Sequence, residues 1–259
     1  EYVIKAMREA KVHTSWISPN EDYERATSQF IEAILKPDKA NRFLKTFSEF
    51  LAPILRAGIY NSLAQTLLKI ASPGAPDFYQ GTELWDLNLV DPDNRRPVDF
   101  AKRRELLASL SVKNEDEGNL TDLVSRLISN PGDGRIKLYL TSRALRFRRA
   151  RQALFAEGSY LPLAAHGRKE NHVIAFARIL RERIAVIVTG RFFTRLGVSN
   201  QPPTGGGIWE DSFVALDYPS AAGLYRDVLT GRLIRAGAKL PLAEVFTHLP
   251  VALLERVRA

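Results

Sequence analysis

Apolar side chains recur every three or four residues over positions 1–71, which is the spacing of a buried helix face. This spacing indicates a helical region with short interruptions. The predicted helices cover about residues 2–10, 19–36, 40–52 and 59–71.

Prolines and small polar residues mark the expected ends of these helices. Ser18, followed by Pro19 and Glu21, suggests a capping box in which Ser18 is the cap residue. Pro53 and Gly58 are expected to separate the last two helices, because proline lacks the N–H that an inner turn donates.

Residues 76–80 have a different pattern. The segment is too short for a helix, lies between proline and glycine residues, and contains Phe78 and Tyr79, which favour strands. A single short strand must join a sheet formed by other strands. Since the preceding residues are helical in pattern, its partners are expected outside this sequence.

The second half of the chain changes from helical to strand periodicity near Tyr160. Helices are predicted over about residues 100–111, 119–129 and 134–154. Short apolar runs with turn residues between them, including a turn at Thr230-Gly231, then predict five to seven strands and a β-sandwich. These runs cover residues 172–178, 183–189, 209–216, 224–229 and 251–257, with one helical turn at 243–246.

Composition is ordinary for a globular protein, with 45% hydrophobic and 25% charged residues. The sequence has no cysteine, which excludes disulfides and thiolate chemistry and agrees with a cytoplasmic location. The net charge of +8 raises nucleic-acid binding as a possibility. Its basic clusters, at 143–151 and 178–183, read instead as a helix face and a hairpin turn.

The beginning of the chain indicates that it is the C-terminal piece of a longer protein. It starts at Glu1 inside a helical pattern, and its only methionine is Met7. No signal segment opens it and no run of 18 apolar residues occurs.

The segment 72–100 has the chemistry needed to hold a sugar. It combines aromatic residues with acids, amides and arginines, which are the partners of pyranose faces and of hydroxyl groups respectively. Its central motif reads Gly74-Ala75-Pro76-Asp77-Phe78-Tyr79-Gln80-Gly81-Thr82-Glu83, followed by Asn94-Arg95-Arg96-Pro97.

This motif resembles the last barrel strand and the following loop of the α-amylase superfamily, where it reads roughly Gly-x-Pro-x-x-Tyr-x-Gly-x-Glu and then Asn-Arg-x-Pro. The versions at residues 79–84 and 89–99 are similar to the maltooligosyl trehalose synthase family within it. Residues 8–16 and 58–69 agree with that family. The resemblance is strong to about residue 105 and looser beyond.

The resemblance implies an α+β fold that is the C-terminal portion of such a protein. Residues 1–71 would form a helical insertion. Residues 72–156 would supply the last strand and helices of a (β/α)8 barrel with a substrate loop. Residues 157–259 would form a C-terminal antiparallel β-sandwich.

The resemblance also implies an activity. The reducing-end α-1,4 link of a maltooligosaccharide would become an α,α-1,1 link by intramolecular transglycosylation, without a metal or organic cofactor. The nucleophile, the acid/base and a third carboxylate would follow earlier barrel strands, upstream of residue 1, so the isolated chain is expected to be inactive and to depend on the missing barrel half.

The candidate substrate-binding residues come from three places in the chain, and for each a purely structural role is the competing reading. Lys11 and Trp16 lie at a helix end, Tyr79 and Gln80 end the predicted strand, and the following loop carries a further group. That group is Asp91, Asn94 and Arg95. Trp85 is either a sugar platform or a loop anchor, and Arg96 with Asp99 is expected to form an ion pair.

Other signals are weak. His166, His172 and His248 lack zinc-type spacing, and the glycines at 205–207 read as a loop without a following helix. Two other functions stay open: a related hydrolase, such as one that releases trehalose, and a non-catalytic α-glucan-binding module. Neither membrane nor nucleic acid is expected as a partner.

Overall fold

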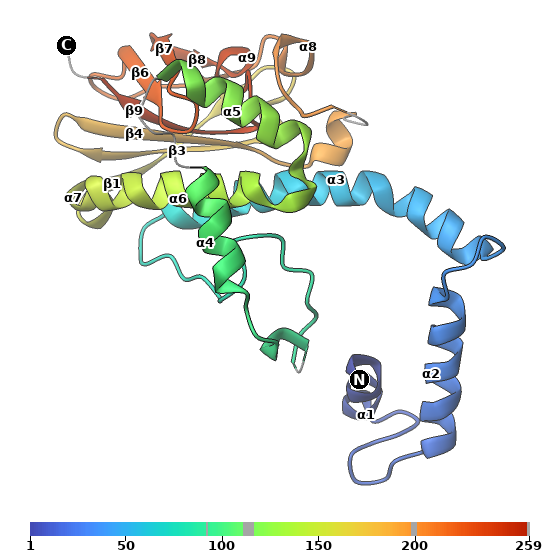
Figure 1. The fold of residues 1–259 in the computed structure, drawn as a ribbon. Coiled ribbons are helices and arrows are strands. Elements are labelled where there is room, and N and C mark those ends of the chain that lie inside the picture. Colours follow the sequence, from blue (N-terminus) through green and yellow to red (C-terminus); the bar gives the residue numbers. More distant parts are fainter. Residues whose placement is uncertain (92, 111–116, 198–200, 258–259) are drawn as a thin grey trace. The chain divides into compact units, whose positions relative to one another are not determined.

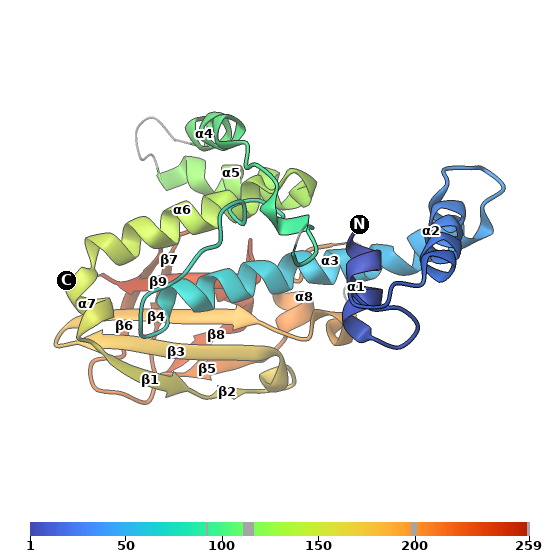
Figure 2. The same ribbon diagram turned by 90° about the horizontal axis from the view of Figure 1, so that it is seen from below.

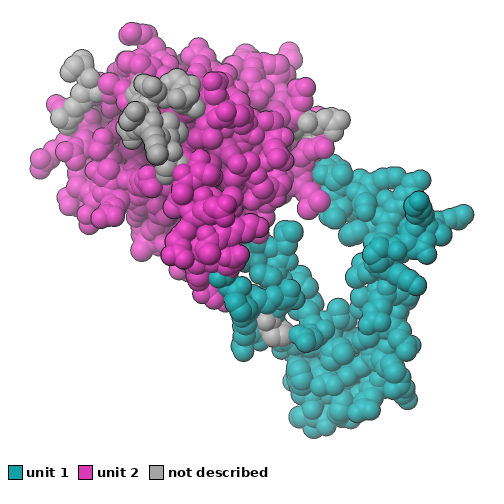
Figure 3. Space-filling view, viewed as in Figure 1, with its two compact units in different colours: residues 1–54, 86–98 teal, residues 55–85, 99–259 magenta. Residues whose placement is uncertain are grey.

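The computed structural model describes residues 1–91, 93–110, 117–197 and 201–257. The chain forms two compact units, shown separately coloured in Figure 3. The first comprises Glu1–Ile54 and Asp86–Val98, and the second comprises Leu55–Trp85 and Asp99–Ala259. The predicted division into three domains at residues 71 and 156 stays a prediction.

The first unit contains α1 (Tyr2–Ala10), α2 (Glu21–Leu35), the beginning of α3 (Arg42–Ala71) and a 3-10 turn, η1 (Asp93–Arg95). The predicted capping box was wrong, because α2 begins later. Asn20 is its cap residue, and its side-chain oxygen accepts a hydrogen bond from the Tyr23 N–H at 3.1 Å. Ser18 instead closes a turn with Ser15.

Helix α3 runs unbroken for 30 residues through Pro53, so the predicted break was wrong. The proline removes one backbone hydrogen bond, but the C-terminal half of the helix gains more from burial. Tyr60, Leu63, Leu67 and Ile70 each lie at 3% exposure or less and form a stripe at helical spacing.

The second unit combines helices with two antiparallel sheets, so the predicted mixture of helix and antiparallel sheet is confirmed. The predicted helix over 134–154 is divided at Arg151 into two. The helices are α4 (Phe100–Ser109), α5 (Glu117–Ser129), α6 (Arg135–Ala150), α7 (Gln152–Ala156), α8 (Gly206–Trp209) and α9 (Leu242–Val245). Short 3-10 turns are η2 (Pro131–Asp133), η3 (Glu170–His172) and η4 (Phe193–Leu196).

The six-stranded sheet has the order β1-β3-β4-β9-β6-β7, and the three-stranded sheet has the order β2-β5-β8. The strands are β1 (Ser159–Leu163), β2 (Ala165–His166), β3 (Val173–Leu180), β4 (Arg183–Gly190), β5 (Phe213–Ala215), β6 (Gly223–Asp227), β7 (Leu233–Ala236), β8 (Lys239–Pro241) and β9 (Val251–Arg256). The predicted hairpin over 172–189 is confirmed: β3 and β4 pair antiparallel, with Ile179 opposite Ile184.

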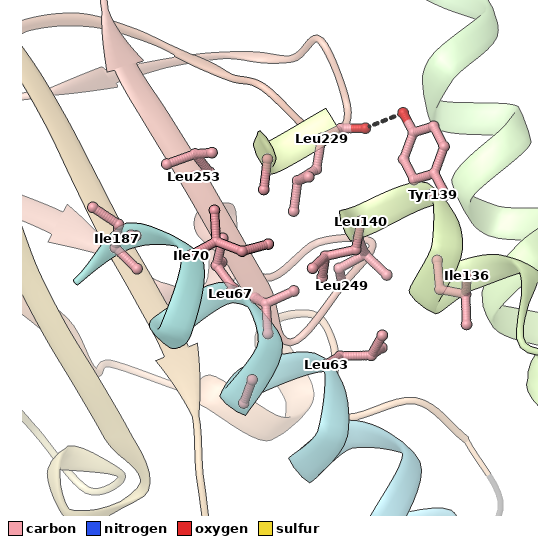
Figure 4. Close-up of a cluster of buried hydrophobic side chains, with 14 of the residues drawn as sticks. Leu63, Leu67, Ile70, Ile136, Tyr139, Leu140, Ile187, Leu229, Leu249 and Leu253 are labelled. Atoms are coloured by element: carbon pink, nitrogen blue, oxygen red, sulfur yellow. Dashed lines mark hydrogen bonds between the residues drawn. The ribbon is translucent and has the colours of Figure 1, made fainter. Parts of the chain in front are cut away.

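The centre of the large sheet, at β4, is buried on both faces. Val186 and Val188 face a cluster shared with the three-stranded sheet and the buried Trp209, whereas Ala185 and Ile187 face a cluster shared with helices. The second half of α3 and α6 lie along this helical face (Figures 1 and 2). Figure 4 shows the packing of their leucine and isoleucine side chains against β4 and β9.

Within this chain residues 76–80 form no strand and pair with none of the described strands, which agrees with the expectation that their partners lie outside the sequence. One shorter prediction needs correction. The glycine-rich loop does lead into a helix, the single turn α8, in which Trp209 donates its indole N–H to the Pro203 carbonyl at 2.8 Å. The strand predicted from residue 209 therefore begins only at Phe213.

Two arginines bind the carbonyl groups at the C-terminal end of α3. Arg148 of α6 donates to the carbonyls of Ile70 at 2.5 Å and Ser72 at 3.1 Å. Arg178 of β3, only 2% exposed, donates to Ala71 at 3.4 Å. It also donates to Phe155 and Gly158, both at 2.8 Å. The sequence placed Arg178 where the predicted strand 172–178 meets the predicted hairpin turn; in the structure it is a strand residue that closes two helix ends.

Helix α6 is also attached to the turn between β6 and β7. The Tyr139 hydroxyl donates to the Leu229 carbonyl at 2.6 Å, as Figure 4 shows, and Arg143 donates to the Val228 carbonyl at 2.8 Å. Arg151 binds Glu255 at 2.5 Å, and Arg148 binds the end of α3. Together with Arg143, three of the five arginines within residues 143–151 therefore have partners inside the chain. This weakens the nucleic-acid interpretation.

We expect Arg178→Met to lower the free energy of unfolding by about 3 kcal/mol, because it leaves buried carbonyls without a donor. Chemical denaturation of the variant would measure this. Arg146→Met is the matched control: Arg146 is exposed on α6, so its replacement should change stability by less than about 0.5 kcal/mol. Equal effects of the two substitutions would contradict the capping role of Arg178.

The buried carboxyl of Asp227 predicts a pH dependence. It accepts hydrogen bonds from the Leu229 N–H at 3.0 Å and the Thr230 hydroxyl at 2.6 Å, but burial still raises its pKa from 3.8 to about 6. Between these values the folded state retains a proton that the unfolded state has released. The contribution of Asp227 to stability therefore falls as pH rises from about 4 to about 6.

We expect Asp227→Asn to remove this fall. The stability of the variant relative to the parent should increase between pH 4 and pH 7.5 by on the order of 2–3 kcal/mol. Urea unfolding at several pH values would measure it, with exposed Asp217→Asn as control. If parent and Asp227→Asn curves run parallel across this range, the assignment is wrong.

Candidate functional site

The loop 86–98 in the first unit holds three of the predicted sugar-binding residues, around η1. Asp91 forms an ion pair with Arg95, and Asp93 forms one with Arg96, as expected for the local acids. The predicted pair of Arg96 with Asp99 was wrong, because Asp99 caps α4 by accepting from the Lys102 N–H at 2.9 Å.

This loop is attached to α1 through Lys5, which sequence analysis did not identify. The Lys5 ammonium donates to the Asp91 carbonyl at 2.5 Å and to its carboxylate at 3.1 Å. The two residues are 86 positions apart, so no local pattern could have paired them. The contact holds the backbone of Asp91 as well as its side chain.

The loop between α1 and α2 carries Lys11 and Trp16. Lys11 ends α1 in a left-handed conformation with φ 56°, and both side chains are exposed. Trp16 is 56% exposed, and the Arg8 guanidinium lies 5.0 Å from its ring centre. An exposed indole face next to a cation is a surface on which a sugar ring can stack.

A buried acid, Glu24 of α2, fixes this loop. It accepts two hydrogen bonds from Arg8, at 2.8 and 2.7 Å, and one from the Thr14 hydroxyl at 2.6 Å. These donors, Arg8 first, lower the Glu24 pKa from 4.5 to about 2. Thr14 in turn accepts from the Asn20 N–H at 2.9 Å, so the loop is joined to the cap of α2.

Tyr79 and Gln80 belong to the second unit and are exposed there. Tyr79 is 50% exposed, whereas the preceding Phe78 packs on the helical core with the Lys69 ammonium 3.9 Å from its ring centre. Adjacent side chains therefore have different surroundings: Phe78 is packed on the core, and Tyr79 is half exposed.

Glu83 and Trp85, which follow shortly after Gln80, make structural contacts. Trp85 donates its indole N–H to the Pro131 carbonyl at 2.6 Å and is half-buried, which favours the loop-anchor reading over the sugar platform. Glu83 binds Arg103 at 2.8 Å, and Arg103 also donates to the Gly81 carbonyl at 2.8 Å.

An open hollow of about 660 Å³ lies between the start of α1 and the loop 86–98 in the first unit. Among its lining residues, the sequence assigned only Arg95 to substrate binding. Sequence spacing does not reveal that the start of a helix meets a distant loop. The lining residues are Glu1, Tyr2, Val3, Leu89, Asp93, Arg95 and Arg96.

The chemistry of these groups suits a neutral, hydroxyl-rich ligand. Carboxylates and guanidinium groups accept from and donate to hydroxyls, and aromatic faces cover the apolar faces of sugar rings. In the described part of the chain, no three histidine or acidic residues gather as a metal site, and no helix is long and apolar enough to cross a membrane.

Comparisons with known proteins agree with the motifs. No protein-family profile matches the chain. A curated protein of Mycobacterium tuberculosis, provisionally named maltooligosyl trehalose synthase, is 35% identical over 258 residues. The match covers 100% of this chain and 28% of that protein.

Solved structures give the same result. The maltooligosyltrehalose synthase of Arthrobacter ramosus matches with 36% identity and a TM-score of 0.74, over 99% of this chain and 29% of that one. Another structure of a maltooligosyl trehalose synthase matches 98% of this chain and 29% of its own, with 31% identity and a TM-score of 0.67. The resemblance indicated by the sequence is thus confirmed: along its whole length the chain is homologous to maltooligosyl trehalose synthases, and it spans about 28% of the length of the curated relatives it matches.

Proposed function

We propose that this chain is part of an α-glucan mutase that converts the reducing-end α-1,4 link of a maltooligosaccharide into an α,α-1,1 link. The observation that carries the proposal is the similarity to maltooligosyl trehalose synthases over the whole chain, at 35% identity. The sugar-binding chemistry of the loops 11–20 and 86–98 supports it independently.

The proposed reaction is a glycosyl transfer with retention. A carboxylate displaces the terminal glucose and forms a covalent glycosyl link, while an acid protonates the departing oxygen. The freed glucose then attacks through its anomeric hydroxyl, and the same acid, now a base, takes up that proton. No water is consumed and no glucose is released, so each event removes one reducing end.

We assign none of the catalytic carboxylates to this chain. Asp91 and Asp93 of the loop 86–98 are engaged in pairs with Lys5, Arg95 and Arg96, which suits binding and positioning. The nucleophile, the acid/base and the third carboxylate would lie in the rest of the protein, since this chain spans only 28% of the relative's length.

The role proposed for this chain is to hold the glucan. Lys11 and Trp16 would bind near the reducing end, with Trp16 stacking on a glucosyl ring. Asp91, Asn94 and Arg95 would bind hydroxyls from the loop 86–98, and Tyr79 with Gln80 would do so from the second unit.

The finer fold assignment belongs to this proposal. Residues 76–80 would become the last strand of a (β/α)8 barrel, paired with strands contributed by the rest of the protein. The two antiparallel sheets would form the C-terminal β-sandwich, for which the apolar cluster between them is the support. A cytoplasmic location is also proposed.

We expect residues 1–259 alone to leave the reducing ends of maltohexaose unchanged. The full-length protein should remove them without releasing glucose. A reducing-sugar assay, with trehalose and glucose measured separately, tests both statements. Rapid conversion by residues 1–259 alone would contradict the placement of the carboxylates, and release of glucose or free trehalose by the full-length protein would favour the hydrolase instead.

We expect Trp16→Ala in the full-length protein to weaken maltohexaose binding about tenfold, because a stacking face is lost. Calorimetry would measure it. Phe30→Ala is the matched control, since Phe30 is an exposed aromatic of α2 in the same unit, at 63% exposure. If residues 1–259 bind starch and Trp16→Ala changes nothing, the non-catalytic glucan-binding reading is favoured.

A further inference from the structure

We infer that Lys5 is a positioning residue that keeps the proposed mutase from acting as a hydrolase. It would do so by fixing the loop 86–98 to the same helix that fixes the loop carrying Lys11 and Trp16. This inference rests on the proposed function, and it concerns a residue for which the sequence motifs gave no role.

The contacts of Lys5 are suited to holding a loop. Its side chain is 20% exposed, and its ammonium group meets the Asp91 carbonyl at 2.5 Å, the Asp91 carboxylate at 3.1 Å and the Glu9 carboxylate at 3.8 Å. A bond to a main-chain carbonyl fixes the path of the backbone, which a pair between two side chains alone would not do. Charge-assisted bonds of this kind are among the stronger ones in proteins.

Asp91 is the point at which this tether meets the proposed sugar-binding group. It also pairs with Arg95, which lines the hollow at the start of α1. Movement of Asp91 would therefore displace Arg95 and the turn η1 of which Arg95 is the last residue. Lys5 itself is not among the residues that line the hollow, so it acts through Asp91.

A second cation of α1, Arg8, holds the loop that carries Lys11 and Trp16. Arg8 follows Lys5 by three residues, a spacing that places both on neighbouring positions of one helix surface. Arg8 binds Glu24 through two hydrogen bonds and lies 5.0 Å from the Trp16 ring centre. One nine-residue helix therefore sets the positions of two proposed substrate-binding segments at once.

The consequence for the reaction concerns water. The freed glucose must stay in place until its anomeric hydroxyl attacks the covalent intermediate, and water competes for the same carbon. A loop 86–98 released from α1 holds the glucose less firmly and admits water, which raises the share of hydrolysis. A general loss of stability would lower both reactions together and leave their ratio unchanged.

The test is the ratio of released glucose to non-reducing product made from maltohexaose by the full-length protein. We expect Lys5→Met to raise this ratio about fivefold or more, and Lys5→Arg, which keeps the charge and the donors, to restore most of the parent ratio. Lys45→Met is the matched control, because Lys45 is an exposed lysine of α3 in the same unit. An unchanged ratio in Lys5→Met would overturn the inference.

Hydrogen exchange separates this inference from the proposed function. In Lys5→Met the amides of residues 86–98 should exchange faster, with those of residues 63–71 unchanged and those of 86–98 in Lys45→Met at the parent rate. Absence of mutase product from the parent protein would refute the proposed function, and the exchange rates would still decide whether Lys5 fixes the loop. Unchanged protection of 86–98 would overturn the positioning role.

Discussion

The second unit depends on the way two guanidinium groups complete the C-terminal end of α3. The last carbonyls of any helix lack partners within the helix, and those of α3 end inside a packed layer where water does not reach them all. Arg148 and Arg178 supply the donors from α6 and from β3. Three elements distant in the sequence are thereby joined at one point.

Burying two guanidinium groups close together is electrostatically unfavourable, and nearby groups compensate for it. Burial lowers the pKa of both arginines, and the positive charge of Arg148 adds to the effect at Arg178. The negative end of the α3 dipole and several carbonyl groups offset that cost. Phe155 lies between them, with its ring centre 5.2 Å from the Arg148 guanidinium and 5.7 Å from that of Arg178.

Gly158 shows how tightly this junction is packed. A side-chain carbon at this position would lie 2.2 Å from the Leu154 carbonyl oxygen, so only glycine fits where the chain leaves α7 and enters β1. Its own carbonyl accepts from Arg178. The same arginine therefore closes the ends of α3 and α7 and fixes the first strand of the large sheet.

Local periodicity predicted most of the elements, because each buries one face or one stripe. The hairpin of β3 and β4, the strand β9 and the helical stripe of α3 all have patterns that a short window contains. The break at Pro53 was mispredicted because burial of Leu63, Leu67 and Ile70 outweighs one lost hydrogen bond. Residues 76–80 form no strand within this chain, which agrees with the expectation that a strand there needs partners outside the sequence.

In the candidate site, too, short sequence patterns did not reveal contacts between distant segments. Trp16, Asp91 and Arg95 were identified from two short motifs, and the residues of each motif lie within a few positions of one another. Lys5 and Glu24, which hold those residues in place, were not, because their partners are 86 and 16 residues away. Motifs identify the side chains that could touch a ligand, whereas the side chains that position them are revealed only when distant segments meet.

The difference between residues that contact a ligand and residues that position them also bears on how a mutase is distinguished from a hydrolase with the same catalytic groups. The groups that break the glycosidic bond do not decide what attacks the intermediate, because glucose and water both present a hydroxyl. The choice depends on how long the freed glucose is held in position, and hence on the rigidity of the surrounding loops. In this chain, Lys5 and Arg8 on α1 make the contacts that hold the proposed binding loops, so selectivity would reside in a helix that does not itself perform the chemistry.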